Sequence, residues 1–101
     1  MVQIELIPNM EHCIETTARK EYQRLMLEYL GGKGAPDFED KIDLLRMFLE
    51  TSDFRKLRKE SEAELLQGKK VKFILQLDKA DFSYHMVVDQ QIDFKQLAGL
   101  L

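Results

Sequence analysis

The chain has 101 residues, of which 45% are hydrophobic and 33% are charged, and its formal net charge is −3. This composition is typical of a globular domain rather than a disordered segment, and a chain of this length buries roughly two thirds of its unfolded surface around one core. The small negative charge gives no global attraction to nucleic acid or to an anionic membrane, so either partner would require a local basic patch. We therefore expect one domain over residues 1–101.

Cysteine content and hydropathy indicate which cellular compartment to expect for the protein. Cys13 is the single cysteine and has no partner for an internal disulfide, which argues against a disulfide-rich secreted scaffold. The first residues lack a basic region followed by a long apolar run, and no apolar stretch approaches the ~18 residues that span a bilayer. The sequence predicts a cytoplasmic protein without a membrane segment.

The chain opens with an alternating segment and continues as a helix. Val2, Ile4 and Leu6 alternate with polar residues, which predicts a strand that ends before Pro8. Asn9 is a plausible N-cap, so a helix is expected from there to the glycines at 31–34. Its apolar stripe recurs every three or four residues and comprises Met10, Ile14, Ala18, Tyr22, Leu25 and Tyr29.

Two further helices are expected in the middle of the chain. Pro36 and Asp37 suit the start of one helix, and the cap residues at 51–53 place a boundary or bend after it. The next helix is closed by Gly68. The apolar stripes of the two helices are Phe38, Ile42, Leu45, Phe48 and Leu49, and then Phe54, Leu57, Ser61 and Leu65.

The last third of the chain predicts a hairpin followed by a short helix. Apolar residues occupy alternate positions over 71–77 and again over 82–88, on either side of a polar break at 79–81. Asp93 is suited to cap a short terminal helix. The sequence thus predicts a small two-layer α+β domain of order β-α-α-α-β-β-α, in which helices pack on one face of a short antiparallel sheet containing a C-terminal hairpin.

The segment from Glu11 to Cys13 is the one place where a nucleophile and a base stand together. Adjacent helical residues point about 100° apart, so His12 and Cys13 do not face one another. A zinc site needs about four ligands, and the sequence offers no second Cys/His pair. We expect Cys13 to be a core residue whose thiol pKa is raised by burial.

Other motifs have simpler structural explanations than catalytic ones. The glycines at 31–34 follow a helix and lack the order of a phosphate-binding loop. The acidic residues Asp37, Glu39, Asp40 and Asp43 fit helix capping better than a cation site. His85 falls on the sheet face opposite to Tyr84 and Met86, as an outward polar position. We expect no catalytic residue, metal site or cofactor.

The remaining signals concern binding partners. The end of the first helix is apolar on more than one side, through Tyr22, Met26, Leu27, Tyr29 and Leu30, and Ile74 and Val87 share the second sheet face. This excess favours a non-enzymatic protein-interaction module that self-associates. The alternative is a nucleic-acid-binding or regulatory domain, for which the basic residues are Arg55, Lys56, Arg58, Lys59 and Lys70.

Overall fold

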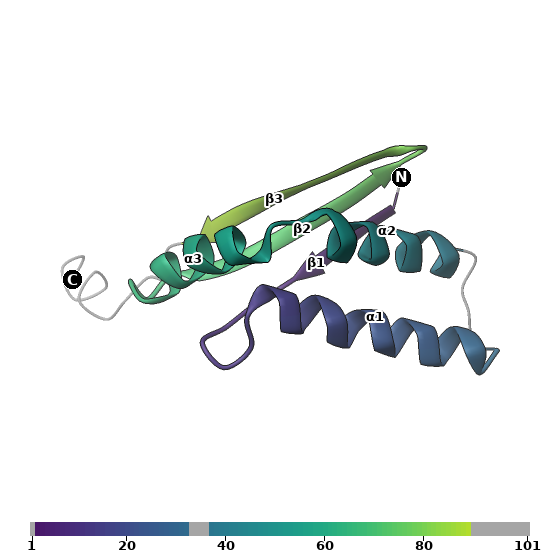
Figure 1. Cartoon of the computed structure of the whole chain (residues 1–101), viewed down its shortest axis with the longest axis horizontal. Helices are drawn as coiled ribbons and strands as arrows, with labels where there is room; N and C mark the ends of the chain where they lie inside the picture. The colour runs from purple at the N-terminus through teal and green to yellow at the C-terminus, as the bar shows by residue number, and fades with distance from the viewer. Residues whose placement is uncertain (1, 33–36, 90–101) are drawn as a thin grey trace, which may run out of the picture.

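The computed structural model describes residues 2–32 and 37–89, which form three strands and three helices (Figure 1). In chain order these are β1 (Val2–Leu6), α1 (Ile14–Leu30), α2 (Phe38–Thr51), α3 (Phe54–Leu65), β2 (Lys70–Asp78) and β3 (Asp81–Asp89). The predicted α+β class and the order of these six elements are confirmed. The terminal helix predicted at Asp93 lies outside the described residues.

The sheet is antiparallel, with β2 between β1 and β3. The hairpin of β2 and β3 pairs without interruption from Lys70 opposite Asp89 to Asp78 opposite Asp81. Because successive side chains of a strand point to opposite faces, one row of β2 is buried and the next is not. Val71, Phe73 and Leu75 are at most 1% exposed. The predicted alternation therefore defines the inner face of the sheet.

The helices lie on that inner face, and α1 is the outermost of them. Both α2 and α3 contact β2, and α2 also contacts β1, whereas α1 packs chiefly on α2 and α3 (Figure 1). Phe48 of α2 is fully buried and makes edge-to-face contacts with Phe54 and Tyr84, at ring-centroid distances of 5.3 and 5.2 Å. These ring contacts link the core residue Phe48 to Phe54 of α3 and to the exposed Tyr84 of β3.

The boundary between α2 and α3 lies where the cap residues predict it. Ser52 ends α2, and its amide donates to the carbonyl of Phe48 at 3.2 Å. Asp53 begins α3, and its side chain accepts from the amide of Lys56 at 3.3 Å. The apolar spacing alone would predict one long helix here. The polar pair Ser52 and Asp53 divides it into two.

The predicted start of α1 is wrong. Asn9 does not cap the helix, because its side-chain oxygen accepts from the amides of Glu11 and His12, each at 2.8 Å. A separate turn forms before the helix, and α1 begins at Ile14 with Cys13 as its N-cap residue. Met10, which the sequence places on the buried stripe, is 59% exposed as a result.

Candidate functional site

A pocket of about 450 Å³ opens between the start of α1 and the outer side of α3. We call it the α1–α3 pocket. It combines three cationic side chains with two acidic ones, a thiol and an aromatic ring. The lining residues are Cys13, Glu15, Phe54, Arg55, Arg58, Lys59 and Glu62.

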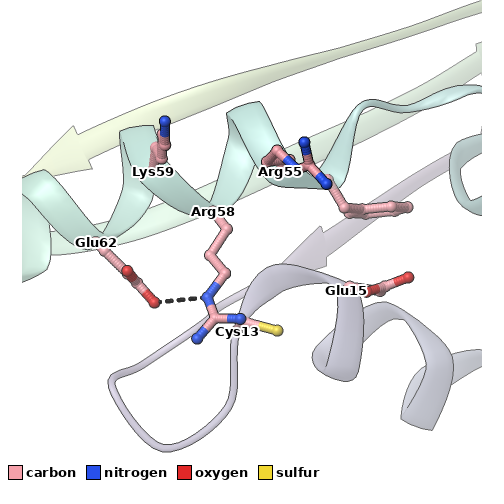
Figure 2. Close-up of a pocket in the computed structure, with 7 residues that line it drawn as sticks. Cys13, Glu15, Arg55, Arg58, Lys59 and Glu62 are labelled. Carbon is pink, nitrogen blue, oxygen red and sulfur yellow. Dashed lines mark hydrogen bonds and ion pairs between the residues drawn. The ribbon is translucent and has the colours of Figure 1, made fainter.

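Arg58 crosses the gap between the two helices. Figure 2 shows its side chain reaching from α3 toward Cys13, while Arg55 and Lys59 stand on either side of it along α3 and project from the upper side of the helix in this view. The Nε of Arg58 donates to Glu62 Oε1 at 2.8 Å, and this carboxylate raises the pKa of Arg58 above its ordinary value. Arg58 is thereby held over the start of α1.

The environment of Cys13 differs from the sequence-based expectation. Its side chain is half-buried rather than enclosed in the core, and its sulfur lies 3.4 Å from Thr16 Oγ1. Partial burial acts to raise the thiol pKa. Hydrogen bonds from the Thr16 hydroxyl and from the amides of Thr16 and Glu15, together with the charge of Arg58, outweigh burial and set the pKa below its ordinary value. The prediction of a raised pKa is wrong, because the helix begins at this residue instead of before it.

The structure brings together three of the five basic residues that the sequence singles out. Arg55, Arg58 and Lys59 line the α1–α3 pocket, whereas Lys56 and Lys70 do not. Lys56 is turned about 100° from Arg55 around the helix axis. Lys70 is the first residue of β2 and lies opposite Asp89 of β3 in the strand register. The nucleic-acid alternative therefore rests on three neighbouring cations rather than on one continuous basic stretch.

The other polar candidates remain apart from this pocket. His85 is exposed and lies opposite Ile74 on the outer sheet face, as its position in the strand predicts. Glu39 and Asp40 fall in the first turn of α2, where the helix dipole favours acidic side chains. Within residues 2–32 and 37–89, no group of three or more His, Cys, Asp or Glu side chains is arranged to hold a metal ion.

A second surface covers the C-terminal half of α1. Leu27 and Leu30 are 72% and 74% exposed, and Tyr29 is 40% exposed. Tyr22 and Met26 are half-buried beside them and pack on the edge of the core. These five residues form the α1 apolar surface. It includes an open groove of about 400 Å³ lined by Tyr22, Gln23, Met26 and Leu27.

Acidic side chains of α2 border the far end of this surface. A second groove of about 230 Å³ runs from Met26 and Leu30 to Glu39 and Asp43. The hydroxyl of Tyr29 donates to Glu39 Oε1 at 2.5 Å, which places that carboxylate beside the apolar surface. Arg19 and Lys20 are exposed toward the opposite end of the same helix. The α1 apolar surface thus lies between the Glu15–Arg19 ion pair and Lys20 of α1 at one end and carboxylates of α2 at the other.

The outer face of the sheet is less apolar than the α1 surface. Ile74 and Val87 are both half-buried there, and the other described positions of that face are polar. These polar residues are Gln3, Glu5, Lys70, Lys72, Gln76, Asp78, Asp81, Ser83, His85 and Asp89. The excess of apolar residues that the sequence indicates is therefore concentrated on α1.

A protein-family model matches residues 2–92, a range that contains all six described elements. The chain belongs to that family. The family is uncharacterised, so membership defines a shared domain and assigns no activity. No curated protein and no solved structure shows significant similarity to the chain. Among the described residues, no helix is both long enough and apolar enough to cross a membrane.

Proposed function

We propose that the protein is a non-enzymatic interaction module that pairs with a second copy of itself through the α1 apolar surface. The exposure of Leu27 and Leu30 carries this proposal. Two leucines exposed side by side, next to Tyr29 and Met26, leave apolar area in water that association would remove. Isolated exposed leucines need no explanation, but a contiguous group on one helix face does.

The distribution of charge favours a second copy as the partner. A two-fold axis through Met26 would pack the two α1 helices antiparallel and set Tyr22 of one copy beside Leu30 of the other. The same rotation carries Arg19 of one copy, which pairs with Glu15 of its own copy at 3.0 Å, toward Glu39 of the other. The guanidinium of Arg19 would then contact an acidic side chain of each copy. Such charge complementarity fixes orientation and speeds encounter more than it adds affinity.

The size of the surface sets the expected strength. A helix of 17 residues is about 25 Å long, and one face of it is smaller than the roughly 800 Å² per partner of a standard interface. We therefore expect a dissociation constant in the micromolar range, with monomer and dimer in exchange. The pairing would act as a concentration-dependent assembly step.

Light scattering and sedimentation at micromolar concentrations test the proposal. The wild-type chain should approach twice its mass of 11.9 kDa, and the double variant Leu27→Glu, Leu30→Glu should remain monomeric. Leu66→Glu is the matched control, because Leu66 is also 74% exposed but lies beyond the end of α3. This control should dimerise like the wild type. Circular dichroism would verify that all variants keep their helices.

Charge reversal tests the orientation separately. Arg19→Glu should weaken the dimer, and adding Glu39→Arg should restore it, because the two residues meet across the two-fold axis. A wild-type monomer throughout the micromolar range would refute the proposal. Loss of the dimer in Leu66→Glu but not in the α1 variant would refute the assignment of the surface.

A further inference from the structure

The α1–α3 pocket carries positive charge that the described residues leave uncompensated. Of its two acids, Glu62 accepts from Arg58 at 2.8 Å, and Glu15 pairs with Arg19 at 3.0 Å. Arg55 and Lys59 form no ion pair within residues 2–32 and 37–89. Because Arg19 and Arg58 neutralise the two acids, the charges of Arg55 and Lys59 remain uncompensated at the pocket.

These two cations share one face of α3. Residues four apart on a helix lie about 6 Å from each other, so Arg55 and Lys59 are neighbours along one side. Figure 2 shows both on the same side of α3, with Arg58 between them and Cys13. Their side chains are exposed and long, and each can turn toward a ligand at the pocket rim without displacing core residues.

The order of charges along α3 also opposes the helix dipole. The positive end of the dipole is at the N-terminus, where acidic residues are favourable. The first turn of α3 contains no acidic residue, and its last turn contains no basic one. Arg55, in the first turn, is therefore unfavourably placed in the dipole, although the N-cap carboxylate of Asp53 lies beside it, and it repels the neighbouring cations Arg58 and Lys59. A bound anion would relieve this repulsion. Anion binding therefore accounts for an order of charges that helix stability does not explain.

We propose that the α1–α3 pocket binds a small molecule bearing a phosphate monoester, held by Arg55, Arg58 and Lys59 against the ring of Phe54. A phosphate monoester carries a charge of about −1.5 to −2 at neutral pH, which matches the two uncompensated cations, whereas a carboxylate would match only one. Guanidinium groups bind phosphate oxygens in pairs, and a lysine adds a point charge. The pocket volume of about 450 Å³ is within the usual range for small-molecule sites. This site is distinct from the α1 apolar surface and does not depend on dimer formation.

Calorimetric titration with phenyl phosphate at low ionic strength tests the proposal. Wild-type protein should bind with saturation, and the double variant Arg55→Gln, Lys59→Gln should bind about ten-fold or more weakly. Lys56→Gln is the control, because it removes a charge from the same helix at a position that does not line the pocket. Its affinity should stay close to that of the wild type, and thermal melting would check that the variants fold.

Parallel titrations distinguish an organic phosphate ligand from inorganic phosphate and from nucleic acid. Inorganic phosphate should bind more weakly than phenyl phosphate, because it has no apolar part to contact Phe54. Equal affinity for the two would overturn the assignment to an organic phosphate. Equal weakening in Lys56→Gln, or no saturable binding up to about 10 mM ligand, would overturn the site. Binding of a single-stranded oligonucleotide but not of phenyl phosphate would overturn it in favour of nucleic acid.

Discussion

At the scale of single residues, Cys13 is the position where local geometry most changes the expected chemistry. The sequence places it inside a helix with apolar neighbours, whereas the structure places it at the helix start beside Thr16 and Arg58. A thiolate is favoured there because nearby amides, a hydroxyl and a cation all stabilise negative charge. The difference of a single helical turn reverses the direction of the pKa shift.

We predict that Cys13 reacts with iodoacetamide in the folded protein at lower pH than in the denatured protein. The pKa of its thiol is lowered on folding, so the pH midpoint of the labelling rate should fall likewise. Thr16→Val should move the midpoint upward, because it removes the hydroxyl near the sulfur, and Thr16→Ser should not. Equal midpoints for folded and denatured protein would contradict this.

The same shift links stability to pH. A group whose pKa is lower in the folded state contributes stability that is complete above its unfolded pKa and is lost as the pH falls through its folded pKa. The free energy of unfolding should therefore rise with pH across that window in the wild type. Cys13→Ser should flatten this rise, which urea denaturation at a series of pH values would measure.

Lys79 occupies an unfavourable conformation in the turn between β2 and β3. Its φ is 57°, in the left-handed region that favours glycine, and it is the one described non-glycine residue with positive φ. We predict that Lys79→Gly stabilises the protein by up to about 1 kcal/mol, measured by urea denaturation. Ala80→Gly is the control at the adjacent turn position, where φ is not positive, and it should destabilise. A loss of stability in Lys79→Gly would show that the turn does not strain this residue.

At the scale of elements, the two ends of α1 differ in how well the sequence predicts them. The glycines after Leu30 mark the C-terminus correctly, since Gly31 is the C-cap and Gly32 has φ of 77°. The N-terminus is misplaced, because an asparagine that precedes an apolar stripe suits a cap and an isolated turn equally well. Only the partners of the Asn9 side chain distinguish the two. Composition and periodicity contain no information about them.

The packing of α2 against the hairpin gives a prediction at this scale. Phe48 is fully buried and contacts Phe54 and Tyr84 edge-to-face. Phe48→Ala should lower the free energy of unfolding by about 3–5 kcal/mol, because it removes ring contacts and leaves a cavity between α2, α3 and β3. Leu66→Ala, at an exposed position, should change it by less than about 0.5 kcal/mol. Urea denaturation would measure both, and similar values for the two would contradict the core assignment.

At the scale of the whole molecule, the sheet and the helical layer follow from sequence periodicity, whereas the α1–α3 pocket does not. Alternation fixes the inner face of β2 because the strand has a period of two, and burial of Phe73 confirms it. The pocket joins Cys13 to Arg55 and Arg58, which are distant in the chain. Their proximity depends on how α1 packs on α3, and no short-range pattern encodes that angle. The α1 apolar surface lies between these cases, because its residues are evident in the sequence but their exposure is a tertiary property.

The length of α1 has a consequence for any assembly of the chain. Cys13, at the pocket, and Met26, at the centre of the apolar surface, are about 20 Å apart along the helix at ~1.5 Å per residue. Antiparallel pairing through Met26 would place the two pockets at opposite ends, roughly 40 Å from each other. One small ligand cannot reach both, so each pocket would fill independently. A scaffold that presents two phosphates at this spacing would gain avidity from the second, intramolecular contact. The dimer would then bind two phosphates at this spacing more tightly than at other spacings, a selectivity that neither copy has alone.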